Sequence, residues 1–205
     1  MLKFVGKQLR KPTGFFGKII SILMQKGNSS IYNRIISELE INQNDNILEI
    51  GYGPGLGIER ILAKYDCFVT GIDFSELMFK EATKRNKKYI DSKMAVLYLG
   101  DFLSININSN EFDKIFCLNV IYFWDKLHEP FAKIYRGLKD GGLFCFYMAH
   151  QEDLNKLKFT KNDIFNKYSI EQVVEKLEIS GFKVINYEIE IEYRFERGYF
   201  IKCRK

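Results

Sequence analysis

From Asn46 to the end of the chain, short apolar segments alternate with longer stretches in which apolar residues recur every three or four positions. Short, continuously apolar segments are typical of strands buried in a parallel sheet, and the longer stretches are typical of amphipathic helices. The pattern predicts strands at residues 46–51, 67–73, 95–101, 112–121, 143–149, 182–193 and 198–205. It predicts the helices between them at residues 55–65, 76–89, 130–139 and 169–180.

This alternation of strands and helices requires a mostly parallel sheet with helices on both faces. The last two strands are close enough in sequence to pair antiparallel. We therefore expect an α/β fold with a doubly wound, mostly parallel seven-stranded sheet and an antiparallel C-terminal strand. Ligands of such sheets bind beyond the carboxyl ends of the strands. Four polar residues fall at those ends: Asp73, Asp101, Asn119 and His150.

Residues 1–45 precede this alternation and have a different pattern. We expect a loose arm as far as Pro12, a helix over residues 13–25 and a second helix over residues 30–39. An apolar stripe runs along the first helix, formed by Phe15, Phe16, Ile19, Ile20 and Leu23. Because residues 46–205 already account for a complete Rossmann-like domain, residues 1–45 are predicted to form a helical lid over the open carboxyl edge of the sheet.

Charge is distributed unevenly along the 205 residues. Residues 1–34 carry seven basic residues and no acidic one, so this segment has a charge of +7, whereas the whole chain has +5 and the remainder therefore has −2. A chain-wide affinity for nucleic acid is not implied. The basic segment is instead expected to contact an anionic membrane surface or an acidic acceptor.

The spacing of the cysteines indicates the cellular compartment of the protein. Cys67, Cys117, Cys145 and Cys203 are far apart in sequence, which favours neither a zinc-ligand pair nor a disulfide framework. No apolar run reaches the roughly 18 residues that span a bilayer. We expect a cytoplasmic protein with reduced thiols and no metal site.

The glycine-rich stretch "ILEIGYGPGLGIERI", residues 47–61, carries the first chemical signal. A dinucleotide fingerprint needs glycine at a third position that is here Leu56 or Ile58, depending on the register. Glu49 precedes the loop, at the point where a pyrophosphate would otherwise bind, and a carboxylate repels phosphate. A ligand with an ammonium group and no phosphate removes this conflict.

Four segments in order carry a family resemblance: "LEIGYGPGLG", "VTGIDFSELMFKEA", "YLGDF" and "FDKIFCLNVIYFW". They resemble the four motifs of the Rossmann-like (class I) S-adenosylmethionine-dependent methyltransferases, and the resemblance covers residues 46–205. The segment from Arg10 to Asn33 is similar to the N-terminal region of some bacterial members that act on small molecules.

The resemblance implies S-adenosylmethionine as the cofactor. Glu49 would supply charge near its ammonium group, Asp73 would accept both ribose hydroxyls, Asp101 would accept from the adenine amino group, and Asn119 would reach the methionine tail. The full set of cofactor-binding residues implied is Glu49, Gly51, Tyr52, Gly53, Gly55, Asp73, Phe74, Met78, Gly100, Asp101, Phe102 and Asn119.

The acceptor side is less specified. Tyr122 and Trp124 follow the fourth strand and are interpreted either as the wall of an acceptor pocket or as aromatic residues that pack a helix. His150 follows the fifth strand and is interpreted either as a general base or as a loop histidine. Methyl transfer itself is an in-line displacement, in which orientation supplies much of the rate.

The function predicted is therefore an S-adenosylmethionine-dependent methyltransferase acting on a small or lipophilic acceptor. Two alternatives remain, an RNA methyltransferase and a module that binds the cofactor without transferring methyl. The segment Asn119–Tyr122, Asn-Val-Ile-Tyr, lacks the Pro-Pro-aromatic signature of enzymes that methylate amino groups of nucleic-acid bases, which disfavours nucleic acid as the partner. A nicotinamide-linked oxidoreductase is disfavoured by Glu49 and by the glycine spacing.

Overall fold

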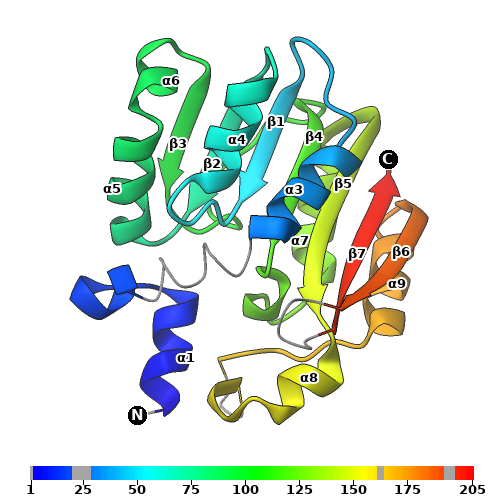
Figure 1. Ribbon diagram of the computed structural model, residues 1–205. Coiled ribbons are helices and arrows are strands. Elements are labelled where there is room, and N and C mark those ends of the chain that lie inside the picture. Colours follow the sequence, from blue (N-terminus) through cyan, green and yellow to red (C-terminus); the bar gives the residue numbers. More distant parts are fainter. Residues whose placement is uncertain (1, 20–28, 161–163, 192–196) are drawn as a thin grey trace.

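A seven-stranded sheet forms the centre of the computed structural model, which describes residues 2–19, 29–160, 164–191 and 197–205 (Figure 1). Its strands are β1 (Asn46–Ile50), β2 (Phe68–Asp73), β3 (Ala95–Leu99), β4 (Phe112–Leu118), β5 (Leu138–Ala149), β6 (Lys183–Ile191) and β7 (Arg197–Arg204). Their order is β3-β2-β1-β4-β5-β7-β6. The first five strands are parallel, whereas β7 pairs antiparallel with both β5 and β6, so the expected fold class is confirmed.

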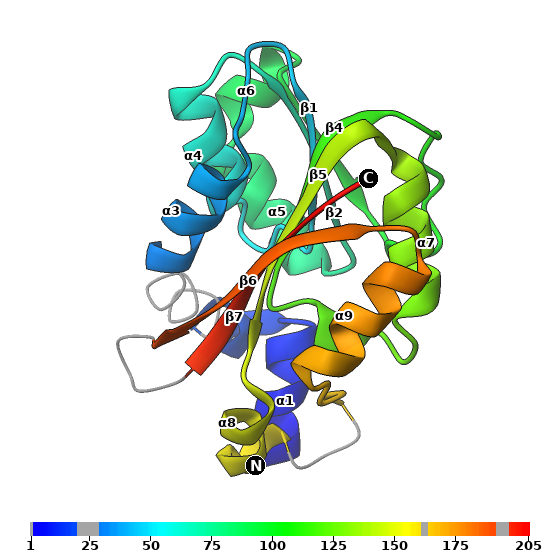
Figure 2. The same ribbon diagram turned by 90° about the vertical axis from the view of Figure 1, so that its right-hand side faces the viewer.

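Helices cover both faces of this sheet (Figure 2). On one face lie α3 (Ser29–Glu38), α4 (Leu56–Lys64) and α5 (Glu76–Arg85), and on the other lie α7 (His128–Gly137) and α9 (Ile170–Ile179). Each face has its own buried cluster, because successive strand side chains point to opposite faces. The parallel strands are buried between these layers, and this explains their continuously apolar sequences.

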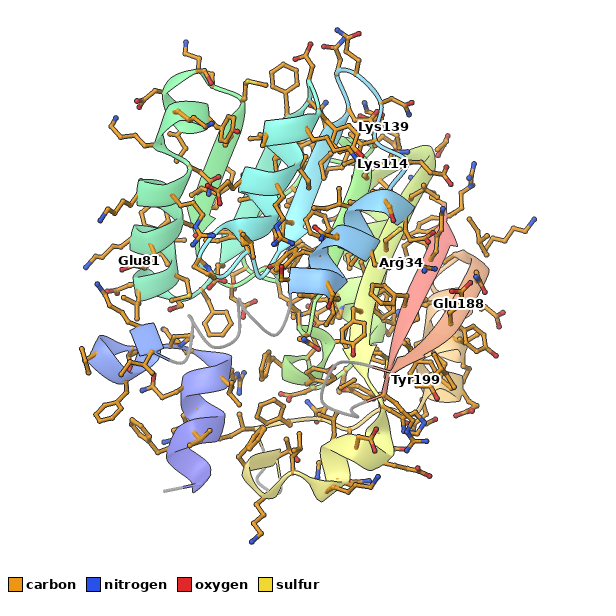
Figure 3. The ribbon with its side chains drawn as sticks, viewed as in Figure 1. Arg34, Glu81, Lys114, Lys139, Glu188 and Tyr199 are labelled. Carbon is orange, nitrogen blue, oxygen red and sulfur yellow. The ribbon has the colours of Figure 1, made fainter. Side chains whose placement is uncertain are left out.

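Helix α3 belongs to this core. Ile31, Ile35 and Ile36 are buried in the same cluster as Ile47 of β1 and Ile58 of α4. Farther along the sheet, Arg34 of α3 forms an ion pair of 2.8 Å with Glu188 of β6 (Figure 3). The part of the N-terminal segment available to cover the carboxyl edge is therefore the part that precedes α3.

The chain before Pro12 is helical, so the prediction of a loose arm is wrong. Helix α1 (Leu2–Arg10) lies beyond the carboxyl ends of the parallel strands and packs against η2 (Lys158–Thr160) (Figure 1). Its end is fixed by Gln8, whose side chain accepts from the Thr13 N–H at 2.8 Å and donates to the Thr13 hydroxyl at 3.0 Å.

The second predicted N-terminal helix lies partly outside the described residues. Residues 14–19 are helical, in agreement with the apolar periodicity, and Phe15, Phe16 and Ile19 of the predicted stripe are exposed. Residues 20–25, with Ile20 and Leu23, are not among those described. In the described part of the chain, no helix combines the length and the apolar character needed to cross a bilayer.

The predicted helix over residues 76–89 is interrupted, which corrects that boundary. Asn86 ends α5, and a short helix, α6 (Lys87–Asp91), follows. The buried Asn86 amide donates to the Gly55 carbonyl at 3.0 Å and to the Ala82 carbonyl at 3.1 Å. The side chain thus joins the end of α5 to the glycine-rich loop, which helical periodicity alone does not reveal.

Three further boundaries differ. Strand β4 ends at Leu118 and is followed by η1 (Ile121–Phe123), and β5 begins at Leu138, directly after α7. The connection after β5 contains α8 (Gln151–Lys156) and η2, two short helices that the apolar periodicity did not predict.

We expect Asn86→Ala to lower the free energy of unfolding by about 1–3 kcal/mol, because it removes two buried hydrogen bonds, to the carbonyls of Gly55 and Ala82. Urea unfolding followed by circular dichroism measures this change. Asn155→Ala is the matched control, since Asn155 is exposed in α8. Equal stability of the two variants would contradict the assigned role of Asn86.

Candidate active site

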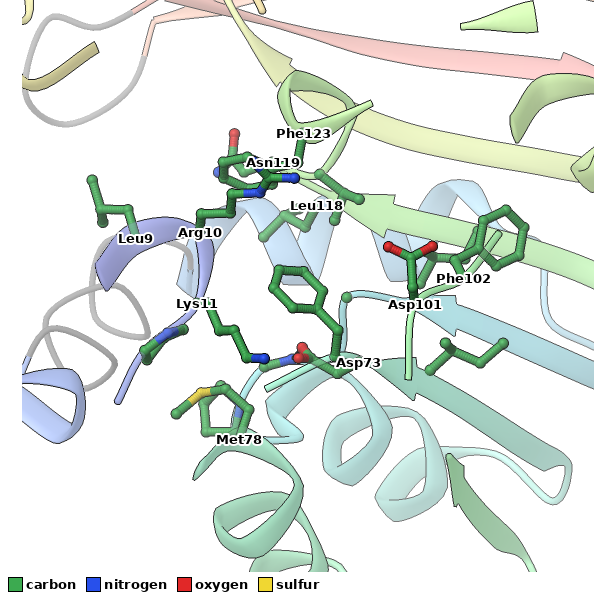
Figure 4. Close-up of a pocket in the computed structure, with 18 of the residues that line it drawn as sticks. Leu9, Arg10, Lys11, Asp73, Met78, Asp101, Phe102, Leu118, Asn119 and Phe123 are labelled. Atoms are coloured by element: carbon green, nitrogen blue, oxygen red, sulfur yellow. Dashed lines mark hydrogen bonds between the residues drawn. The ribbon is translucent and has the colours of Figure 1, made fainter. Parts of the chain in front are cut away.

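A cavity of about 500 Å³ opens at the carboxyl ends of the parallel strands (Figure 4). Its walls come from the ends of β1, β2 and β4, from the loops that follow them and from the N-terminal segment. The lining residues are Leu9, Arg10, Lys11, Pro12, Tyr32, Ile50, Gly51, Gly53, Pro54, Leu56, Ile72, Asp73, Phe74, Met78, Gly100, Asp101, Phe102, Leu118, Asn119, Val120, Phe123 and Trp124. This volume suits a small organic ligand.

The glycine-rich loop brings backbone to the floor of the cavity. Gly51, Gly53 and Gly55 have φ angles of 73°, 51° and 78°, a left-handed conformation that glycine adopts without strain. A Cβ atom on Gly51 would lie 2.5 Å from Cγ2 of Val120, whereas one on Gly53 would meet nothing within 4 Å. Gly51 is therefore required because a side chain there would clash with Val120, and Gly53 exposes its backbone to the cavity.

Asp73, the last residue of β2, is a buried carboxylate on the cavity wall. One oxygen accepts from the Gly53 N–H at 2.9 Å and the other from the Ser75 N–H at 2.8 Å. Burial raises the pKa of Asp73 to about 6, and these two hydrogen bonds and the nearby Lys11 act in the opposite direction. The two bonds also orient the carboxylate and leave lone pairs for a ligand.

Asp101 and Phe102 follow β3 at the next strand end. Asp101 is exposed, and one of its carboxylate oxygens accepts from the Leu103 N–H at 2.7 Å. Phe102 is buried, with its ring centroid 6.1 Å from that of Trp124. A polar acceptor and an apolar surface therefore lie side by side on this part of the wall.

Asn119 follows β4 and has a left-handed backbone with φ of 57°. Its side-chain oxygen accepts from the Tyr122 hydroxyl at 2.9 Å, and this hydroxyl in turn accepts from the Ala149 N–H. The hydrogen-bond chain fixes the orientation of the Asn119 amide, so that its NH₂ group is the part left for a ligand.

The N-terminal segment contributes wall residues that the sequence did not single out. Residues 9–12 all line the cavity. The Arg10 guanidinium lies 5.9 Å from the ring centroid of Phe123, and the Lys11 ammonium lies 5.8 Å from that of Phe74. The available signal was the absence of acids in residues 1–34, which indicated an anionic partner without locating it.

Ten predicted site residues meet at the cavity: Gly51, Gly53, Asp73, Phe74, Met78, Gly100, Asp101, Phe102, Asn119 and Trp124. Five others lie outside its wall: Glu49, Tyr52, Gly55, Tyr122 and His150. Tyr122 still acts on the wall through Asn119. Tyr52 is fully buried under the loop, where its hydroxyl donates to the Tyr98 carbonyl at 3.3 Å.

Glu49 is buried beneath the glycine-rich loop, away from the cavity. It shares the face of β1 with Ile47, which α3 and α4 cover, because alternate residues of a strand point the same way. One carboxylate oxygen accepts from the Tyr32 hydroxyl at 3.1 Å, and the other has no partner. Burial raises the pKa of Glu49 well above its ordinary value. The structure thus assigns to this residue a position different from the one expected beside a ligand's ammonium group.

His150 also lies away from the cavity wall. Its main-chain N–H donates to the Arg197 carbonyl at 2.7 Å, so the chain here follows β7. The imidazole caps α8 by accepting from the Glu152 N–H at 3.3 Å, and it stacks on Tyr199 with ring centroids 5.3 Å apart. This geometry corrects the expected position at the mouth of the site.

The charges on the described wall are balanced. Arg10 and Lys11 are its cations, and Asp73 and Asp101 are its anions. The described residues contain no group of three or more histidine, cysteine or acidic side chains that could hold a metal ion. Such a wall suits a ligand that carries both charges together with apolar surface.

Three features together match the architecture of the Rossmann-like, or class I, methyltransferases. They are the sheet order with an antiparallel β7, the glycine-rich loop after β1, and the acidic residues after β2 and β3. Residues 48–146 match the family model described as "Methyltransferase domain". The chain is a class I S-adenosylmethionine-dependent methyltransferase, and S-adenosylmethionine is its cofactor.

Individual relatives agree with this class. The chain is 28% identical over 177 residues to the uncharacterized methyltransferase YdaC of Bacillus subtilis, covering 86% of this chain and 90% of that protein. It is 26% identical over 166 residues to a sterol 24-C-methyltransferase of Debaryomyces hansenii, covering 76% of this chain but 43% of the longer relative.

Among solved structures, phosphoethanolamine N-methyltransferase 2 of Haemonchus contortus shares the fold, with a TM-score of 0.73 at 19% identity. The match covers 86% of this chain and 52% of that one.

Proposed function

We propose that the protein transfers the methyl group of S-adenosylmethionine to a small or lipophilic acceptor. The observation that carries this proposal is a cavity in which polar groups at the strand ends adjoin an apolar wall formed by Leu118, Val120, Phe123 and Trp124. The similarity to sterol methyltransferases supports a lipophilic acceptor. The four buried, unpaired cysteines support a location in the reducing cytoplasm.

The wall residues fit the cofactor. In this proposal Asp73 accepts from the two ribose hydroxyls, since two backbone donors occupy only part of its capacity of about four lone-pair sites. Gly51 and Gly53 let the backbone approach the amino-acid moiety, and the open space beside Gly53 supports this role. Phe74 and Met78 pack on the adenine, whose amino group Asp101 accepts.

S-Adenosylmethionine supplies an electrophilic methyl group on a sulfonium. The protein's part is to hold the acceptor in line with that group, and orientation of this kind accounts for roughly 7–11 kcal/mol of barrier lowering in favourable cases. Phe123 and Trp124 exclude water from the acceptor side. The described wall contains no histidine, which favours an acceptor that reacts without losing a proton to a histidine base.

The segment that precedes α3 is proposed to be the lid of this site. Residues 9–12 lie on the cavity wall. Two contacts tie the segment to the helix after β2: the Ser75 hydroxyl donates to the Pro12 carbonyl at 2.9 Å, and Lys18 forms an exposed ion pair of 2.9 Å with Glu81. A lid held in this way excludes water when the site is filled.

A lipid extract incubated with methyl-labelled S-adenosylmethionine should yield a labelled, organic-soluble product. The matched control is Asp73→Asn, which should reduce the rate tenfold or more through weaker cofactor binding. Cofactor binding by calorimetry with no labelled product from lipids or small metabolites would indicate a binding module. Label found in RNA alone would indicate the RNA methyltransferase.

Cofactor affinity should fall with decreasing pH around 6. Asp73 accepts hydroxyl protons best as a carboxylate, and its pKa of about 6 in the free protein means that it gains a proton below that pH. The dissociation constant for S-adenosylhomocysteine should therefore be about tenfold higher at pH 5 than at pH 7.5. Calorimetry measures it, and Asp73→Asn should bind weakly with no such dependence. The same pH dependence in the variant would contradict this assignment.

An apolar patch on the N-terminal segment is proposed to contact an anionic membrane surface. Phe4, Phe15, Phe16 and Ile19 are 47%, 75%, 62% and 41% exposed, and the Phe16 ring packs against the rings of both Phe4 and Phe15. Exposed aromatic residues in a segment with no acid are typical of peripheral membrane binding. Such contact would bring the cavity close to lipophilic acceptors.

Vesicle flotation tests this contact. The wild-type protein should float with vesicles of phosphatidylglycerol and phosphatidylcholine, less at high salt, and Phe15→Ser with Phe16→Ser should reduce the bound fraction at least fivefold. Phe68→Ser is the control, because Phe68 is 47% exposed on β2. Equal flotation of all three proteins would exclude the patch as the contact.

A further inference from the structure

Arg10, a cation at one end of the cavity, has no anionic partner among the residues that the structure describes. Figure 4 shows the Arg10 side chain extending from the end of α1 towards Asn119 and Phe123. Its guanidinium lies 5.9 Å from the centroid of the Phe123 ring, and it forms no ion pair with a carboxylate of the described residues. The two carboxylates of the wall lie elsewhere, with Lys11 beside Asp73 and with Asp101 across the cavity (Figure 4).

A second donor faces the same end of the cavity. The Tyr122 hydroxyl donates to the oxygen of the Asn119 amide, and the Ala149 N–H satisfies that hydroxyl in turn. This chain of hydrogen bonds orients the amide so that its NH₂ group, which has no hydrogen-bond partner among the described residues, is presented to a ligand. A guanidinium and an amide NH₂ together are suited to bind a carboxylate.

The proposed cofactor arrangement brings one carboxylate to this end. With the ribose on Asp73 and the adenine near Asp101, the amino-acid tail extends past Gly51 towards Asn119. S-Adenosylmethionine carries a single carboxylate, at the end of that tail.

We propose that Arg10 and Asn119 bind the carboxylate of the cofactor's amino-acid moiety, with Tyr122 as the residue that positions Asn119. This inference rests on the proposed function. It makes the N-terminal helix part of the cofactor site, so that the lid closes on the cofactor through Arg10. Binding of the cofactor would then hold the N-terminal segment in place, and Leu9 and Pro12 of this segment line the same cavity.

The test compares two ligands that differ in the carboxylate alone, S-adenosylmethionine and its decarboxylated form, which keeps the ammonium and the sulfonium. Arg10→Gln should weaken binding of S-adenosylmethionine tenfold or more and binding of the decarboxylated form less than twofold, by calorimetry. Lys7→Gln is the control, because Lys7 is an exposed cation on the same helix that does not line the cavity. It should change neither affinity more than twofold.

Asn119→Asp provides an independent check with nearly the same side-chain shape. It replaces the donor NH₂ by a charge that repels a carboxylate, and aspartate tolerates the left-handed backbone. This variant should bind the decarboxylated form more tightly than S-adenosylmethionine, which reverses the wild-type preference. An unchanged unfolding midpoint shows that each variant is folded.

Three results would overturn the proposal. Equal losses for both ligands in Arg10→Gln would show that Arg10 acts through general charge or lid folding. Unchanged affinity for both ligands in Arg10→Gln would indicate that Arg10 binds an acidic acceptor and not the cofactor. Equal affinity of the wild-type protein for the two ligands would show that no carboxylate receptor exists. Failure of the wild-type protein to bind either ligand would instead contradict the proposed function itself.

Discussion

The left-handed turn between β1 and α4 is the constraint on which the site depends. The chain must leave a buried parallel strand and enter a helix within a few residues, while its backbone remains exposed to the cavity. Gly51, Gly53 and Gly55 make this possible, because side-chain-bearing residues rarely adopt such φ angles. Polar groups surround the turn from below and from the side: Asn86 binds the Gly55 carbonyl, and Asp73 binds the Gly53 N–H.

Glu49, a buried polar residue, also lies beneath this turn and is not among the residues that line the cavity. Glu49 accepts from Tyr32, and both of its carboxylate oxygens fill the space beside Gly57, where a Cβ would approach them to 2.6 Å. A glutamate beneath the loop therefore lies at the junction of α3, α4 and β1. These contacts fix the position of its side chain, whereas its predicted electrostatic effect on a ligand remains a prediction.

The sequence predicted the sheet and ten of the residues that line the cavity, because buried parallel strands are continuously apolar and because their carboxyl ends share one edge. The sequence pattern could not distinguish a residue on the cavity wall from its neighbour in the chain. Glu49 and Ile50 are neighbours in the chain, yet strand alternation directs them to opposite faces. His150 follows a strand end like Asn119, but pairing with β7 leads it elsewhere. The contribution of Arg10 was hidden because residues 2–10 have no strand or motif to place them, and their position depends on contacts with η2.

The hydrogen bond from the Ser75 hydroxyl bears on the rate of cofactor exchange. This hydroxyl accepts the N–H of Met78 as the cap of α5 and donates to the carbonyl of Pro12. One neutral hydrogen bond contributes about 1 kcal/mol, and an exposed ion pair such as that of Lys18 contributes less. If this segment acts as the proposed lid, exchange of the spent cofactor requires these contacts to break. Opening of the segment would then be a step of the catalytic cycle, as it is in many enzymes with lids.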